Sequence, residues 1–258
     1  MTCVVYYGKK CVMKRRDILF SALGLVILWQ SVAMLVSRPI LPAPLNVFIV
    51  FVQELSNGLV THFLFSLWRV TAGMLLSVLV AAPVGLAIGG SQRLDRIFSP
   101  IIYLLYPIPK VVFVPVVLLF LGIGDVAKIT LIFLILFFQI VVLVRDQAAG
   151  LPPQLIQSLH SLGAGRRALF RFVYLPASLP AILTALRQSI GTAVAVLYIT
   201  ELFATKYGLG YYIYYNGSTL FNYPAMYAGV IAMSLLGLGM YYAVDLAERK
   251  LCKWKFVS

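Results

Sequence analysis

The sequence predicts an all-α membrane protein that crosses the bilayer about six times and carries a short helical loop on its cytoplasmic side. Three observations favour this class: 62% of the 258 residues are hydrophobic, only 11% are charged, and the mean hydropathy is +0.96. A chain of this composition would not stay dispersed in water. Its net charge of +13 accompanies long apolar runs, which is typical of topology control and attraction to anionic lipid. We therefore expect a lipid membrane as partner and no nucleic acid.

Six apolar runs approach the length of about 20 residues that crosses a hydrocarbon core of about 30 Å. They cover residues 18–36, 67–90, 97–121, 126–144, 177–204 and 225–246. The third run holds four prolines, namely Pro100, Pro107, Pro109 and Pro115. Because proline breaks helical hydrogen bonding, we expect this span to be kinked or broken. The freed carbonyls should face protein or water rather than lipid.

The distribution of basic residues predicts that both termini are cytoplasmic, since cytoplasmic segments carry an excess of lysine and arginine. With that topology, 15 of the 21 basic residues lie in cytoplasmic segments. Only Arg38, Lys128 and Lys206 lie outside, and Arg69, Lys110 and Arg187 fall within or near the ends of spans. The expected organisation is a cytoplasmic tail (1–17), a transmembrane domain (18–246) with a loop at 145–175, and a second tail (247–258).

The two tails carry all three cysteines, Cys3, Cys11 and Cys252, on the reducing side. No disulfide is expected there. A metal site at Cys3 and Cys11 is an alternative, but with no histidine nearby free thiols are favoured. The first apolar run could also be a cleaved signal peptide. Its length exceeds the usual apolar core of such peptides, which favours an uncleaved helix.

Catalytic residues are not evident in the sequence. The two histidines, His62 and His160, fall on opposite sides of the membrane in this topology, so they cannot share a site. Asp125 and Glu201 fall near outer ends of spans, where interfacial carboxylates reaching water are favoured over a proton relay. The phosphate-binding pattern G-x-x-x-x-G-K-[ST] does not occur. We expect a protein that is not an enzyme; if ATP drives it, another subunit supplies the ATPase.

The loop at 145–175 predicts two short helices separated by a glycine. Pro152 and Pro153 suit a helix start, because proline in the first turn loses no internal hydrogen bond. The helix at 154–162 carries an apolar stripe of Leu155, Ile156, Leu159 and Leu162. Gly163 suits its end, since glycine adopts the left-handed conformation freely. A second helix at 166–174 has Leu169, Phe170 and Val173 on one side, and Leu175-Pro176 should then turn the chain back into the membrane. A hairpin lying on the lipid surface is the alternative.

The spacing of this loop resembles the signature of ABC importer permeases, E-A-A, three residues, G, nine residues, I, one residue, L-P. Gly163, Leu175 and Pro176 match, Val173 stands for isoleucine, and Gln157-Ser158-Leu159 stands for E-A-A. Further segments are similar to the MetI-like type I branch that imports nitrate, sulfonates, taurine and related compounds. They include Ser66-Leu67-Trp68-Arg69, Pro107-Ile108-Pro109, Leu121-Gly122-Ile123-Gly124-Asp125, Ser161-Leu162-Gly163-Ala164 and Tyr207-Gly208-Leu209-Gly210.

The resemblance implies a homodimer of permeases in a bacterial inner membrane, with a cytoplasmic ATPase and an extracytoplasmic substrate-binding protein as partners. The loop would act as a coupling helix that docks on the ATPase, which would bind ATP and Mg²⁺ while this chain holds no cofactor. The docking residues would be Gln157, Ser158, Leu159, Gly163, Arg166, Arg167, Leu175 and Pro176. Glutamine in place of the usual acidic residue can only hydrogen-bond to the ATPase. An exposed charge pair is worth about 0–1 kcal/mol, so apolar contacts could sustain the docking.

Arg69, Lys110 and Arg187 are candidates for the cargo pathway, because charge inside a span is costly unless it faces water or a partner. The structural alternative is that Arg69 and Arg187 reach water at the span ends, whereas the carbonyls freed by the prolines accept hydrogen bonds from Lys110. Four tyrosines after the fifth span suit an interfacial belt or a contact with the binding protein: Tyr211, Tyr212, Tyr214 and Tyr215. An ion-driven secondary transporter is the alternative function, although we find no internal duplication. The residues do not choose the cargo.

Overall fold

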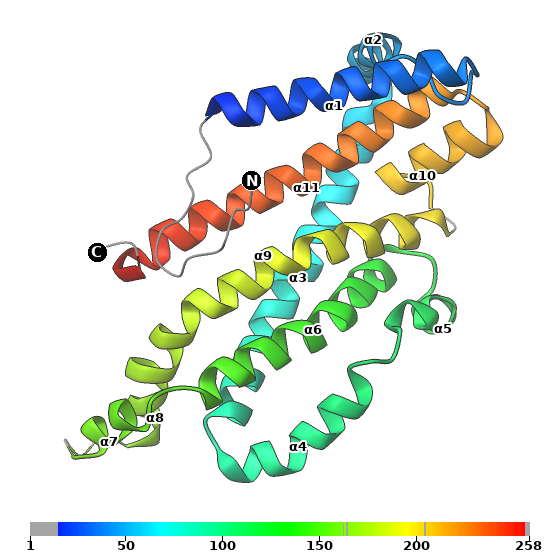
Figure 1. Ribbon diagram of the computed structural model, residues 1–258. Coiled ribbons are helices and arrows are strands. Elements are labelled where there is room, and N and C mark those ends of the chain that lie inside the picture. The colour runs from blue at the N-terminus through cyan, green and yellow to red at the C-terminus, as the bar shows by residue number, and fades with distance from the viewer. Residues whose placement is uncertain (1–14, 162, 164, 204, 256–258) are drawn as a thin grey trace.

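A computed structural model describes residues 15–161, 163, 165–203 and 205–255, and this part of the chain contains helices and no strand (Figure 1). Residues 1–14 of the expected tail (1–17) lie outside it, with Cys3 and Cys11. The helices are α1 (Arg15–Val36), α2 (Pro44–Glu54), α3 (Val60–Gly89), α4 (Gln92–Leu105), α5 (Val114–Leu121), α6 (Asp125–Ala149), α7 (Pro153–Ser161), α8 (Arg166–Leu169), α9 (Leu175–Leu202), α10 (Leu209–Tyr214) and α11 (Tyr223–Leu251).

Five of the described helical stretches are long and apolar enough to cross a membrane, and a bent pair of helices makes a sixth. The predicted all-α fold with about six spans is therefore confirmed. The bent pair consists of α4 and the segment Lys110–Leu121, which meet at 78°. Pro107 and Pro109 lie in the break between them, as the prolines predicted.

The second span begins earlier than predicted. The sequence placed its start at residue 67, but α3 starts at Val60 and is joined to α2 by a π-helical turn at Leu55–Leu59. Gly58 bends this turn with φ +113°, a conformation that side chains other than glycine rarely adopt. The polar residues around it interrupt the apolar run, which hid α2 from a search for continuous hydrophobicity.

Close packing of α3 on α6 forms the centre of the molecule, and α6 in turn packs on α9. The approach is close because glycines face α6. A Cβ added at Gly73 would lie 2.6 Å from Ile132 Cγ2, and one at Gly89 would lie 2.8 Å from Ala148 Cβ. Gly85, four residues before Gly89, also faces α6, with Val144 Cβ at 2.9 Å from an added Cβ, and small residues at this spacing let membrane helices approach closely. The buried side chains of these helices form the core.

The two ends of the bundle carry different structures. Figure 1 shows α7 and α8 toward the end where α11 finishes, and α2 and α10 at the opposite end. The predicted loop and the Gly-Leu-Gly segment therefore lie at opposite ends of the bundle.

Candidate functional sites

The loop between α6 and α9 contains the predicted helix, glycine and second helix. α7 covers Pro153–Ser161, one residue earlier at each end than predicted, and Gly163 has φ +77°. Leu155 is 49% exposed, and Ile156 and Leu159 are half-buried. Leu162, the fourth residue of the stripe, lies outside the described residues. The described part of the chain thus leaves Leu155 uncovered and covers Ile156 and Leu159 only in part.

Polar residues of the predicted docking set also lie on the surface. Gln157 and Ser158 are exposed on α7, and the Ser158 hydroxyl donates to the Gln154 carbonyl at 2.8 Å. Arg167 is exposed at the start of α8, and the side chain of Arg166 is outside the described part. A partner approaching this loop would meet apolar and hydrogen-bonding groups together.

The expected turn at Leu175-Pro176 is wrong. α8 continues through a π-helical turn at Phe170–Tyr174 into α9, so one helix runs over Arg167–Leu202. The N–H of Leu175 donates to the Phe170 carbonyl across this wider turn, and Pro176 follows in the first turn of α9, where a missing N–H is tolerated. The wider turn also changes the helix phase. Val173 is buried, but Phe170, predicted on the same side, is 37% exposed.

A buried ion network lies at the opposite end of the bundle. Arg69 on α3 donates from Nε to Asp125 Oδ1 and from a terminal nitrogen to Glu201 Oε1, both at 2.7 Å. It also donates to the Tyr207 carbonyl at 2.6 Å. The side chains of Arg69 and Glu201 are 4% and 0% exposed. The sequence predicted that both carboxylates reach water. This is wrong for Glu201, which is buried, whereas the Asp125 side chain is 38% exposed and partly accessible.

The same network holds the Gly-Leu-Gly segment before α10. The N–H of Leu209 donates to Ser66 Oγ, and the N–H of Gly210 donates to Glu201 Oε2, both at 2.8 Å. Gly208 has φ +143°, and a Cβ there would overlap the Glu201 carboxyl. This segment needs its glycines because the backbone itself lies against the buried carboxylate.

Lys128 is a second buried cation close to the network, although among the described residues it forms no ion pair within 4 Å. It is 2% exposed on α6 and lies within electrostatic range of Arg69, Asp125 and Glu201. The sequence counted it as an external loop residue, but α6 begins at Asp125 and buries it. Two cations and two anions then balance, which offsets the cost of removing these charges from water.

The three candidate pathway residues lie in three separate places. Lys110 donates to the Leu105 carbonyl at 2.9 Å and to the Tyr106 carbonyl, as the alternative for this lysine predicted, and it lines an open cavity of about 250 Å³. Arg187 on α9 pairs with Asp245 and Glu248 on α11, each at 3.0 Å. Neither Arg69 nor Arg187 simply reaches water at a span end.

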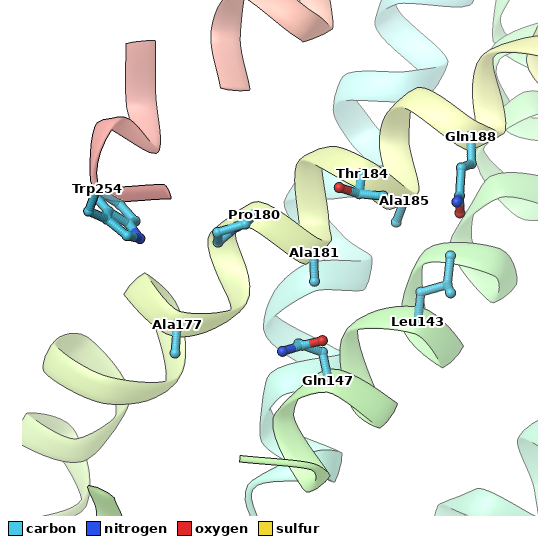
Figure 2. Close-up of a pocket in the computed structure, with 9 residues that line it drawn as sticks. All are labelled: Leu143, Gln147, Ala177, Pro180, Ala181, Thr184, Ala185, Gln188 and Trp254. Carbon is cyan, nitrogen blue, oxygen red and sulfur yellow. The ribbon is translucent and has the colours of Figure 1, made fainter. Parts of the chain in front are cut away.

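A groove that the sequence did not predict opens between α6 and α9 (Figure 2). Its volume is about 550 Å³, and it is lined mainly by small side chains of α9 together with Leu143 and Gln147 of α6. Trp254, which follows α11, stands at one edge. Among the described residues no cluster of three or more histidine, cysteine, aspartate or glutamate side chains could hold a metal ion.

The described residues form a bundle of helices long and apolar enough to cross a membrane, which defines a multi-pass membrane protein. Residues 73–253 match the family described as binding-protein-dependent transport system inner membrane component. The match covers well over half of the chain, so the chain belongs to this family of ABC transporter permeases. Membership confirms the resemblance stated from the motifs and favours it over an ion-driven carrier.

Relatives agree along most of the chain. The MJ0413 protein of Methanocaldococcus jannaschii, described as an ABC transporter permease, is 33% identical over 89% of this chain and 88% of its own length. The taurine transport permease TauC of Escherichia coli K12 is 32% identical over 75% and 70%. The formylaminopyrimidine transport permease ThiX of Halalkalibacterium halodurans is 26% identical over 90% and 93%.

Solved structures share the fold. A chain of the MetNI methionine ABC transporter in an inward-facing conformation superposes with a TM-score of 0.64. The match covers 75% of this chain and 95% of that chain at 21% identity. At this identity the likeness supports the architecture of the bundle and nothing finer.

Proposed function

We propose that this chain is the permease subunit of an ATP-driven importer for a small solute of the sulfonate or taurine class. It works as a homodimer, with a cytoplasmic ATPase subunit that binds ATP and Mg²⁺ and an extracytoplasmic binding protein that delivers the solute. The observation that carries the proposal is the helix–glycine–helix loop of α7 and α8 in a member of the permease family. The taurine relative supports the solute class.

The loop is the docking element for the ATPase. A short helix that presents a partly uncovered apolar stripe suits insertion into a groove on a partner. Leu155, Ile156 and Leu159 supply that stripe, and Gln157 and Ser158 beside it offer hydrogen bonds. Because an exposed charge pair adds only about 0–1 kcal/mol, glutamine at the usual acidic position leaves the docking to the apolar contacts.

The orientation follows from the same assignment. Docking to a cytoplasmic ATPase places the α7–α8 end in the cytoplasm, together with both chain termini, and the α10 end outside. The chain is then a multi-pass protein of a bacterial inner membrane with its basic segments inside, as the positive-inside rule favours. The exposed residues Tyr207 and Tyr214 at the α10 end face the binding protein.

Lys110 is the strongest of the three pathway candidates. Its ammonium lies beside an open cavity that Gln139 also lines. Arg69 and Arg187 are occupied by carboxylates within the subunit. Their role is to hold helices together, and a solute would have to displace an ion pair to reach them.

The first test is purification of the chain from its native cells in mild detergent, with mass spectrometry of the proteins retained. Gly163→Val should lose the ATPase, because a β-branched residue cannot readily adopt φ +77°. Gly165→Val is the matched control in the same loop, where φ is not positive and nothing lies within 4 Å of an added Cβ. Failure to retain any ATPase with the wild type, under conditions that keep a known importer intact, would refute the docking proposal.

The second test is solute uptake in vesicles that contain the permease, the ATPase and the binding protein. Uptake should require ATP and all three components. Uptake by this chain alone in ATP-free vesicles, driven by an ion gradient, would instead establish a secondary transporter.

A further inference from the structure

The groove between α6 and α9 contains three polar, uncharged side chains among small apolar ones. Gln147 lies near the end of α6, and Thr184 and Gln188 lie on α9. Gln188 is 13 residues beyond the start of α9, or about 20 Å along its axis at 1.5 Å per residue. It follows Arg187, whose pairs with Asp245 and Glu248 place this part of α9 beside the end of α11, so the groove lies toward the end of the bundle that carries α7 and α8.

These polar groups are not used within the subunit. In the part of the chain that the structure describes, no hydrogen bond joins the side chains of Gln147, Thr184 or Gln188 to a protein partner, and Gln147 and Gln188 are exposed. Polar side chains within spans generally face a cavity, a water-filled path or a partner. The groove supplies such a cavity, because Ala177, Ala181 and Ala185 leave the space that larger side chains would fill (Figure 2).

The edge of the groove is fixed by the end of α11. Arg187 pairs with Asp245 and Glu248, which ties α11 to α9 one residue from Gln188. Cys252 is fully buried, and its N–H donates to the Glu248 carbonyl at 2.8 Å. This anchors the short 3-10 turn Lys253–Lys255, whose Trp254 lines the groove. An indole at the mouth of a polar groove offers an apolar face and one hydrogen-bond donor.

We infer that this groove is a binding station for the transported solute on its way to the cytoplasm, and that it takes small molecules with no net charge, such as the zwitterion taurine, in preference to the anionic sulfonates of the proposed solute class. The inference rests on the proposed function and adds a site and a chemical class to it. Its volume of about 550 Å³ lies within the range of small-molecule pockets, about 300–1,000 Å³. The residues lining it are uncharged, so a zwitterion or a neutral heterocycle is accepted, whereas a simple anion finds no counter-charge.

Weak binding by uncharged side chains also suits a site that the solute must leave again. Conduction requires binding strong enough to enter and weak enough to release. Amides and a hydroxyl meet that requirement because they hydrogen-bond to the solute without forming an ion pair.

The test uses Trp254 as reporter in the full chain reconstituted in nanodiscs. Trp29→Phe and Trp68→Phe leave it as the single tryptophan. The probes are taurine, a zwitterion; cytosine, a neutral pyrimidine; and nitrate and methanesulfonate, which are anions. Taurine or cytosine should change Trp254 fluorescence saturably, and the two anions should not. A saturable response to the anions alone, or no response to any probe, would overturn the inference.

The lining residues supply the second readout. Gln147→Leu with Gln188→Leu should raise the Kd of the responding probe at least tenfold, and Gln53→Leu, on exposed α2 away from the groove, should leave it unchanged. If the groove instead receives a second copy of the chain, the probes give no response and the double variant shifts the protein from dimer to monomer. ATP-driven uptake is measured separately. Uptake without binding in the groove would refute this inference alone, whereas the absence of uptake would refute the proposed function.

Discussion

Replacing Glu201 should lower the free energy of unfolding more than removing a surface ion pair does. The carboxylate accepts hydrogen bonds from Ser66, Arg69 and the N–H of Gly210, and it is fully buried. With Glu201→Leu, the network changes from two cations and two anions to a net charge of +1. Breaking a buried pair by removing one partner costs about 3–5 kcal/mol, a large fraction of a typical stability of about 5–15 kcal/mol.

A double-mutant cycle separates this charge effect from lost packing. Arg69→Met with Glu201→Leu leaves Lys128 and Asp125, one cation and one anion, so the buried charge again balances. The double variant should be more stable than the sum of the single losses predicts, by about 0.5–3 kcal/mol. Reversible unfolding in mixed micelles, followed by tryptophan fluorescence, measures each free energy.

The control is Arg249→Met, since the Arg249 side chain is 63% exposed in its pair with Asp245. Exposed helix pairs of this kind are worth about 0.3–0.5 kcal/mol. A loss below about 1 kcal/mol for Glu201→Leu, or strict additivity in the cycle, would refute the view that the network acts as one balanced unit.

Three further changes have defined outcomes. Gly89→Val should lower the free energy of unfolding by about 1–3 kcal/mol, because its Cβ would press on α6; Gly24→Val, with open space around it, should cost much less in the same assay. Tyr212→Phe should lose the hydrogen bond to Glu54, about 0.5–1.5 kcal/mol. Burial raises the pKa of Tyr212, so the wild type should lose stability above about pH 10, the ordinary tyrosine range, and the variant less. Lys110→Met should speed proteolysis between α4 and α5, since two carbonyls lose their donor.

The spans and the loop could be predicted from sequence because their signals are local. An apolar run of sufficient length defines a span, the prolines at 107 and 109 define the break, and Gly163 defines the end of α7. Pro176 misled for the same reason. Its local sequence predicted a change of chain direction, whereas the π-helical segment Phe170–Tyr174 before it lets the helix continue.

The ion network could not be read from local pattern, because Arg69 and Glu201 are 132 residues apart. One indication was present. The predicted topology already placed Arg69, Asp125 and Glu201 at the outer ends of three spans, and opposite charges at one membrane level favour pairing. The groove left no comparable indication, since it depends on how α6, α9 and Trp254 meet in space.

The uninterrupted helix over Arg167–Leu202 connects the two ends of the molecule mechanically. Its 36 residues span about 54 Å, from the loop proposed to dock on the ATPase to Glu201 in the ion network. The stretch includes a π-helical turn and Pro180, but no loop divides it, so a tilt imposed at Arg167 would be passed on toward Glu201. Because Glu201 accepts a hydrogen bond from the backbone N–H of Gly210, the outer segment that begins α10 would move with it. This helix would therefore transmit nucleotide-driven motion from the docking loop to the outer end of the bundle.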